Sequence, residues 1–196
     1  MKNLKYISLI LFITYINLAQ SQIGINISTG LFNENIESSY KLDLSFAFPL
    51  YNQSFYLQTN MGLSYCNLNT SQDEIITGEF WNIPIKLIGL YYPFDNPIKP
   101  YLGLGICYNI ISFMEGGHAI ESDYGFIFSQ NYDNTFSFNL IIGCNIPITK
   151  NFWLNLETLY NTLTTYTNLN IENKFFKKKW INLRNIEIST GIQFSF

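Results

Sequence analysis

The feature that most constrains this chain is a strict alternation of large apolar residues with small or polar ones. The clearest example covers residues 55–65. One set of alternate positions there is Phe55, Leu57, Thr59, Met61, Leu63 and Tyr65, and the other is Tyr56, Gln58, Asn60, Gly62 and Ser64. A repeat of two residues is typical of a β-strand, because successive side chains point to opposite faces. The pattern therefore predicts strands that have one bulky apolar face and one narrow polar face.

Eight segments carry this pattern, and the connections between them alternate between long and short. The predicted strands cover residues 22–31, 40–50, 55–65, 80–92, 99–113, 136–148, 152–164 and 180–196. Long connections follow the first, third, fifth and seventh strands, whereas tight turns follow the second, fourth and sixth. Short turns on one side and long loops on the other are typical of transmembrane barrels. We therefore predict an all-β, eight-stranded, antiparallel up-and-down transmembrane β-barrel.

Alternation alone is equally compatible with a soluble barrel that is apolar inside, so the composition has to decide. Charged residues make up 13% of the chain, against about 25% in an ordinary soluble domain. Eight strands enclose barely enough space for side chains, which favours the glycine-, serine- and asparagine-rich face inside. Aromatic residues also gather near strand ends, where interfacial girdles form. We expect a polar interior and a lipid-facing exterior, with the barrel in a bacterial outer membrane and both termini on the periplasmic side.

The first residues have the composition of an export signal. Lys2 and Lys5 precede an apolar run at residues 7–16, and Ala19 and Ser21 supply the small residues that a signal peptidase requires. We predict a signal peptide over residues 1–21, cleaved after Ser21 with Ala19 as the alternative, and one barrel domain over residues 22–196. The apolar run is shorter than the roughly 20 residues of a membrane-spanning helix, which makes a retained anchor the weaker interpretation.

One stretch in the middle of the chain resembles a known family. Asn82-Ile83-Pro84-Ile85-Lys86 is followed by an aromatic strand end, a proline-bearing turn and Lys99-Pro100-Tyr101-Leu102-Gly103-Leu104-Gly105. This arrangement resembles the PorT-like outer-membrane β-barrels. The resemblance implies an outer-membrane barrel, and some relatives take part in protein secretion or gliding machinery. The family pattern contains no catalytic residues that this chain would inherit.

Several charged residues fall on the predicted inward face and form a candidate lumen network. They are Asp43, Lys86, Glu157 and Glu187, with Arg184 near the upper end of the last strand. Two interpretations are open, namely a mutually paired plug and a path for protons or ions. Because a buried charge is costly unless it is paired, the plug is the simpler interpretation. We expect Lys86 to pair with Asp43 or Glu157.

A second candidate is the run Lys177-Lys178-Lys179, which closes the predicted loop 165–179. It would lie where lipopolysaccharide phosphates are found, although a solvated charge run is the alternative. The long loop at residues 114–135 holds the single histidine, His118, and several carboxylates. One histidine with scattered carboxylates is a weak metal signal, and the three cysteines match no metal spacing.

These patterns indicate function only in outline. We predict no catalytic residue, no metal site and no cofactor, and the net charge of −3 with no basic face argues against nucleic acid. The expected partners are outer-membrane lipid, lipopolysaccharide, the barrel-assembly machinery and a protein bound by the outer loops. We expect a non-enzymatic barrel that binds or assembles through these loops, within a secretion or surface complex. The alternatives are a narrow pore for small solutes and a lipid-modifying enzyme.

Overall fold

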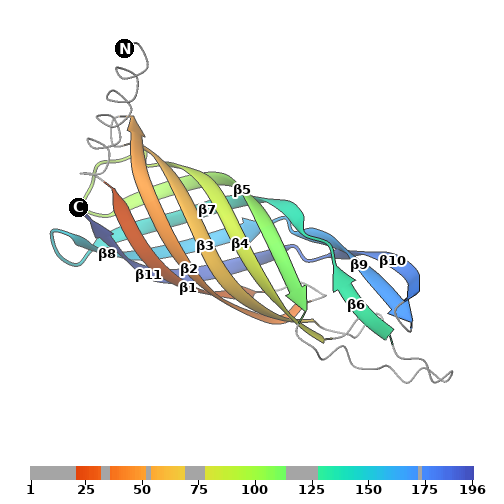
Figure 1. Cartoon of the computed structure of the whole chain (residues 1–196). Helices are drawn as coiled ribbons and strands as arrows, with labels where there is room; N and C mark the ends of the chain where they lie inside the picture. The colour runs from red at the N-terminus through yellow and green to blue at the C-terminus, as the bar shows by residue number, and fades with distance from the viewer. Residues whose placement is uncertain (1–20, 32–35, 52–53, 69–77, 114–127, 172–173) are drawn as a thin grey trace, which may run out of the picture.

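The computed structural model describes residues 21–31, 36–51, 54–68, 78–113, 128–171 and 174–196. Eight of its strands form one closed barrel in the order β1-β11-β8-β7-β5-β4-β3-β2 (Figure 1). These strands are β1 (Gln22–Leu31), β2 (Ile36–Tyr51), β3 (Phe55–Leu68), β4 (Gly78–Tyr91), β5 (Lys99–Phe113), β7 (Thr135–Pro147), β8 (Phe152–Asn161) and β11 (Asn185–Ser195). The predicted fold class is confirmed. The predicted signal peptide lies almost entirely outside the described residues.

The barrel closes because its first and last strands pair along their whole length. β1 runs antiparallel to β11, from Gln22 opposite Ser195 to Leu31 opposite Ile186. All other neighbours in the wall are also antiparallel. Closure leaves no open strand edge, which is the condition for a sheet to cross a membrane. The backbone amide of Phe196 donates to the Ser21 carbonyl at 3.2 Å, so the first and last described residues meet at one end of the barrel.

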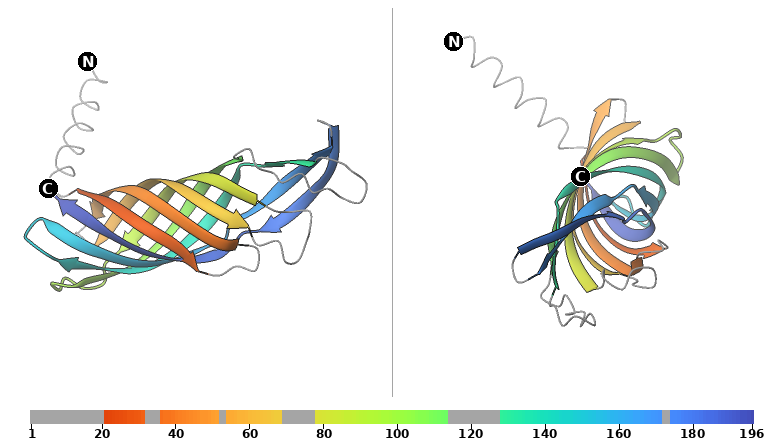
Figure 2. Two further views of the ribbon diagram at one scale, coloured as in Figure 1. Left: turned by 90° about the horizontal axis from the view of Figure 1, so that it is seen from below. Right: turned by 90° about the vertical axis from the view of Figure 1, so that its right-hand side faces the viewer.

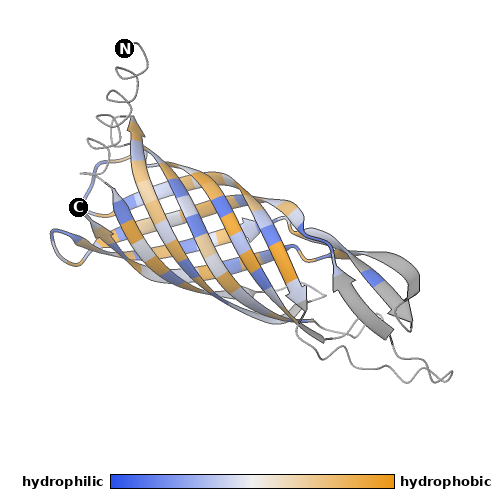
Figure 3. Ribbon diagram, in the orientation of Figure 1, coloured by the Kyte–Doolittle hydropathy of each residue, from blue (hydrophilic) through white to orange (hydrophobic). Residues whose placement is uncertain are grey.

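The barrel is inside-out relative to a soluble protein. Large apolar side chains cover the outer wall, and the Leu104 side chain is 70% exposed. Asn109 of β5 and Asn155 of β8 lie on the opposite face of their strands. Both are 0% exposed and face the interior. In Figure 3 apolar and polar residues alternate along the barrel strands nearest the viewer. The predicted orientation of the two faces is therefore confirmed. No helix in the described ranges is long and apolar enough to cross a membrane.

A second, three-stranded sheet projects from the end of the barrel opposite the C-terminus (Figures 1 and 2). It consists of β6 (Phe128–Tyr132), β9 (Thr164–Ile171) and β10 (Lys174–Asn182), with β9 in the centre. We call it the extension sheet. The prediction that residues 165–179 form a loop is therefore wrong, and the loop predicted at 114–135 contains β6. Residues 114–127, including His118, lie outside the described part of the chain.

The extension sheet forms because the barrel ladder continues beyond the wall. The backbone amide of Leu183 donates to the Leu163 carbonyl at 2.9 Å, which joins the β8–β11 pairing to the β9–β10 pairing. The backbone N–H and C=O groups of β9 and β10 thereby find partners in each other, although neither strand has the apolar alternation of the barrel strands. The last predicted strand, 180–196, is consequently divided between β10 and β11.

Candidate functional site

The interior of the barrel is layered, and β4 passes through every layer. Its inward residues, from the extension end to the turn end, are Phe80, Asn82, Pro84, Lys86, Ile88 and Leu90. All six are buried, and they change from apolar to polar and back to apolar. The lumen therefore contains a polar middle between two apolar ends. The predicted polar interior therefore holds for the middle of the lumen, and both of its ends are apolar.

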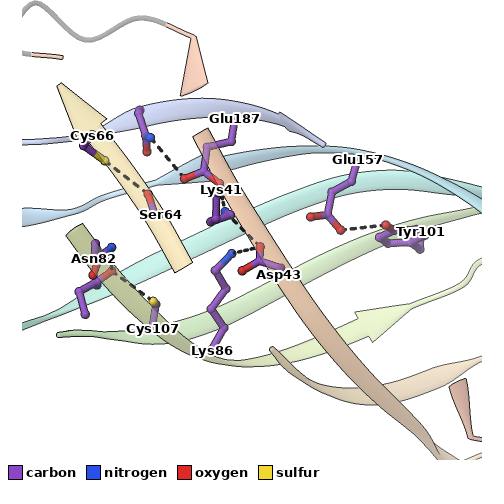
Figure 4. Close-up of polar contacts among 12 residues, drawn as sticks. Lys41, Asp43, Ser64, Cys66, Asn82, Lys86, Tyr101, Cys107, Glu157 and Glu187 are labelled. Atoms are coloured by element: carbon purple, nitrogen blue, oxygen red, sulfur yellow. Dashed lines mark hydrogen bonds and ion pairs between the residues drawn. The ribbon is translucent and has the colours of Figure 1, made fainter. Parts of the chain in front are cut away.

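The polar middle is centred on four buried charges, which we call the ion-pair layer (Figure 4). Lys86 Nζ lies 3.2 Å from Asp43 Oδ2, and Lys41 Nζ lies 3.3 Å from the same oxygen. Lys41 also pairs with Glu187. Two ammonium groups thus face two carboxylates, so the layer is neutral as a set. Such a chain of contacts offsets the cost of taking each charge out of water.

The Lys86–Asp43 pair joins two strands that are not neighbours. Lys86 lies on β4 and Asp43 on β2, so the pair passes over β3. The residue of β3 opposite Asp43 is Gly62. A Cβ at that position would lie within 2.0 Å of Asp43 Oδ1, so any side chain there would displace the carboxylate. The ion-pair layer therefore depends on glycine at position 62.

Glu157 belongs to a neighbouring set of hydrogen bonds, in which its partners are uncharged side chains. The Tyr101 hydroxyl donates to Glu157 Oε2 at 3.0 Å, and Asn155 Nδ2 donates to the Tyr101 hydroxyl at 2.6 Å. Asn155 Nδ2 also donates to Asn145 Oδ1 at 2.8 Å, and Asn145 Nδ2 donates to the Tyr92 hydroxyl at 3.2 Å. This chain of contacts leads from the middle of the lumen toward the turn end. It holds the buried carboxylate without a described ion pair.

The turn end of the lumen is filled by an apolar and aromatic plug. Its members are Ala47, Tyr56, Ile88, Leu90, Tyr92, Tyr101, Ile141 and Leu159. Glycine makes room for them: a Cβ on Gly143 would lie 2.4 Å from the ring of Tyr101, and one on Gly103 would lie 2.8 Å from Leu90. This explains why the narrow face of the predicted strands is rich in glycine.

The extension end contains a second apolar cluster. Its members are Cys66, Phe80, Ile111, Leu163, Ile181 and Leu183, with Tyr132 of β6 packed against them. The rings of Phe80 and Tyr132 lie 5.5 Å apart, which ties the extension sheet to the barrel mouth. Burial raises the pKa of the Tyr132 phenol. The mouth opposite the tight turns is therefore lined by apolar groups.

One seam of the wall is interrupted. β3 and β4 pair from Phe55–Tyr91 to Met61–Ile85 and again from Ser64–Asn82 onward, and the two pairs between are missing. The residues concerned are Gly62 and Leu63 on β3, and Ile83 and Pro84 on β4. Proline has no N–H to donate to a ladder. On its other side β4 pairs with β5 without a gap. The interruption lies immediately to the extension side of Lys86.

The structure places the predicted site residues in three groups. Asp43, Lys86 and Glu187 lie together in the ion-pair layer, with Glu157 beside Tyr101. Arg184 lies apart from them: it is exposed, between β10 and β11, and its backbone amide donates to Asn182 Oδ1 at 3.1 Å. The prediction that Arg184 faces the lumen is wrong, because inward Leu183 and Asn185 flank it.

Lys177, Lys178 and Lys179 lie on β10, but their side chains are outside the described part of the structure. The lysine that sequence reasoning missed is Lys41, which shares the inward face with Asp43. The alternation that places Asp43 on the inward face also places Lys41 there, two residues earlier, so this signal was sufficient to include Lys41 in the network. No group of metal-ligating side chains occurs within the described ranges. The three cysteines are free thiols.

Comparison with known proteins agrees with this architecture. The model of the OmpW family matches residues 60–196. OprG from Pseudomonas aeruginosa superimposes with a TM-score of 0.71 at 15% identity, covering 92% of this chain and 97% of OprG. AlkL, solved in lipid bilayers, gives 0.64 at 15% identity over 92% of this chain and 91% of its own. E. coli outer membrane protein W gives 0.54 at 14% identity over 92% and 99%. No curated protein sequence matches the chain.

Proposed function

Because the chain belongs to the OmpW family of eight-stranded outer-membrane barrels, we propose that it carries small apolar molecules into the outer membrane. In this proposal the protein is not an enzyme. The extension sheet faces the cell exterior and both termini face the periplasm. A molecule enters at the apolar extension end, meets the ion-pair layer, and leaves sideways into the lipid between β3 and β4. The narrower PorT-like assignment stays a prediction.

The observation that carries the proposal is the position of the interrupted seam. It lies between the apolar cluster at the extension end and the ion-pair layer, as the order Phe80, Pro84, Lys86 along β4 records. An apolar molecule loses favourable contacts if it moves on toward four buried charges. The same molecule gains apolar surroundings if it passes through the wall into lipid.

A through-going pore is the less favoured alternative. Below the seam, the lumen is crossed first by the ion-pair layer and then by the aromatic plug. Eight strands leave room for little besides these side chains. We therefore expect planar bilayers containing the protein to show no discrete channels. A discrete conductance would favour the pore.

The test is to lock the seam and measure uptake. In a background with the native cysteines replaced by alanine, Leu63→Cys and Ile83→Cys would place two thiols across the gap. The control is Thr59→Cys with Leu87→Cys, an outward pair on the same two strands within the continuous ladder. The readout is the rate at which a fluorescent apolar probe enters the lipid of proteoliposomes.

We expect oxidation to abolish uptake in the seam variant and reductant to restore it, while the control pair transports in both states. Pro84→Ala, which supplies an N–H at the interruption, is expected to slow uptake without a disulfide. Equal transport by the oxidised seam variant and the control would refute the sideways route. The disulfide itself is verified by gel mobility before and after reduction.

A second function, binding of a protein partner within a secretion or surface complex, is favoured by one feature. Among the strands that the structure describes, β6 and β10 form the two edges of the extension sheet, and an open edge is a template for an added strand. A photo-crosslinker at Asn168, on the central strand, is the negative control for crosslinkers at Gln130 and Phe176 on the edges. Capture of one defined protein from the edge positions alone would support this second function.

A further inference from the structure

Arg184 occupies a boundary on the outer wall. Ile186 and Ile188 on β11 and Tyr160 on β8 are the outward residues next to it, and they are 45%, 49% and 40% exposed. They end the apolar band that faces lipid. Arg184 is the next outward position along the chain toward β10, and the one residue between it and Ile186, Asn185, faces inward. Within the described part of the structure, its guanidinium makes no ion pair.

Further out on the same ribbon is an exposed aromatic pair. Trp180 of β10 and Tyr166 of β9 are directly opposite, and their rings meet edge to face at a centroid distance of 4.4 Å. Both side chains are exposed. Trp180 is four residues from Arg184, which is about 13 Å along a strand. Aromatic rings with a polar edge are typical of the membrane–water interface.

The positive charge of the chain is concentrated on this segment. Residues 174–184 contain Lys174, Lys177, Lys178, Lys179 and Arg184, and no acidic residue. They are five of the nine basic residues that follow residue 21. The remaining four are Lys41 and Lys86 in the ion-pair layer, Lys99, which pairs with Asp95 at 3.2 Å, and the exposed Lys150. The carboxylate of Asp133, beside the extension sheet, already has a partner on β9: it accepts a hydrogen bond from Asn168 Nδ2 at 2.9 Å.

We propose that Arg184 and the basic segment of β10 bind the phosphate groups of lipid A, the membrane anchor of lipopolysaccharide. Arg184 contacts a phosphate at the edge of the apolar band, the Trp180–Tyr166 pair further out packs against the sugar headgroup, and the lysines of β10 add positive charge to the same segment. A planar guanidinium is suited to two parallel hydrogen bonds with phosphate. The proposal rests on the outward placement of the extension sheet given above.

The test is a binding titration of the folded protein in detergent micelles, read by native mass spectrometry. The probes are bisphosphorylated lipid A and its dephosphorylated form with the same acyl chains. We expect Arg184→Gln to weaken binding of the phosphorylated lipid about fivefold, the effect of one basic residue near an anionic surface. Replacing all three of Lys177, Lys178 and Lys179 by Gln is expected to weaken it further. Arg184→Lys, which keeps the charge, retains most of the affinity.

Lys150→Gln is the matched control, because Lys150 is exposed on the tight turn at the opposite end. It is expected to bind both lipids as the unaltered protein does. Equal binding of the two lipid forms, or an Arg184→Gln variant that binds like the Lys150→Gln control, would overturn the proposal. Heat-modifiable gel mobility establishes that each variant is folded. Because the titration does not depend on transport, its failure is distinguishable from failure of the seam-locking experiment.

Discussion

Asp43 is the residue on which the ion-pair layer depends, because it is the only partner common to Lys41 and Lys86 in the described contacts. Asp43→Asn keeps the shape of the side chain and removes its charge. Lys41 retains Glu187, whereas Lys86 is left as a buried ammonium without its carboxylate. Loss of one partner from a buried ion pair costs about 3 to 5 kcal/mol. We expect the free energy of unfolding to fall by this amount.

A second substitution separates the loss of charge balance from the loss of a contact. The layer holds two positive and two negative groups, so Asp43→Asn leaves it with one excess positive charge. Adding Lys86→Met removes that excess and leaves Lys41 with Glu187. Removing both charges of a buried pair avoids the cost of leaving one of them uncompensated. We therefore expect the double variant to recover most of the lost stability.

The measurement is urea unfolding of the protein in lipid vesicles, with heat-modifiable gel mobility as the readout of the folded fraction. Asp95→Asn is the control, because the Lys99–Asp95 pair has the same 3.2 Å separation as Lys86–Asp43 but its carboxylate is 91% exposed. Its removal is expected to change stability little. A double variant no more stable than Asp43→Asn would refute the charge-balance argument.

Two further predictions concern packing. Gly143→Ala is expected to destabilise the barrel by about 1 to 3 kcal/mol, because the new methyl group would overlap the Tyr101 ring of the plug. The control in the same unfolding assay is Gly89→Ala. Its Cβ would have its nearest neighbour at 3.8 Å, so we expect this substitution to be tolerated. Leu159→Ala, a substitution within the plug, should cost about 2 to 5 kcal/mol. Leu104→Ala on the outer wall should cost less, and comparable losses at both positions would contradict the assignment of inside and outside.

Much of the barrel is predictable because alternation records a physical boundary. β1 and β5 coincide with the predicted ranges 22–31 and 99–113, since apolar residues alternate with small or polar ones along most of both strands. The pairing of Lys86 with Asp43 is also anticipated, because both residues share the inward face of their strands. The layer is nevertheless larger than predicted, since Lys41 joins it.

The remaining features lie beyond what a single-residue pattern can indicate. In the extension sheet, β9 and β10 are consecutive strands, whereas β6 pairs with β9 across a long sequence separation, from Phe128–Ile171 to Tyr132–Thr167, which no local pattern indicates. Arg184, predicted to join the lumen network near the upper end of the last strand, is three residues from inward Glu187, and this odd spacing places it on the opposite face. The apolar turn end of the lumen is hard to predict from alternation. Ile88 and Leu90 lie in a part of β4 where apolar residues occupy both faces, so either face resembles one that contacts lipid.

The interrupted seam and the ion-pair layer depend on each other through one glycine. Backbone groups within a membrane must be satisfied, so a gap in the wall tends to be costly and to spread along the ladder. Gly62 leaves space for Asp43 to reach Lys86 across β3, and this pair connects β2 to β4 directly below the gap. The ladder resumes at Met61–Ile85 on the turn side of the gap. The charges that close the lumen thus also lie directly beside the interruption of the β3–β4 ladder. A variant that weakens this pair should both lower stability and lengthen the seam, which amide hydrogen exchange at residues 59–61 of β3 would detect.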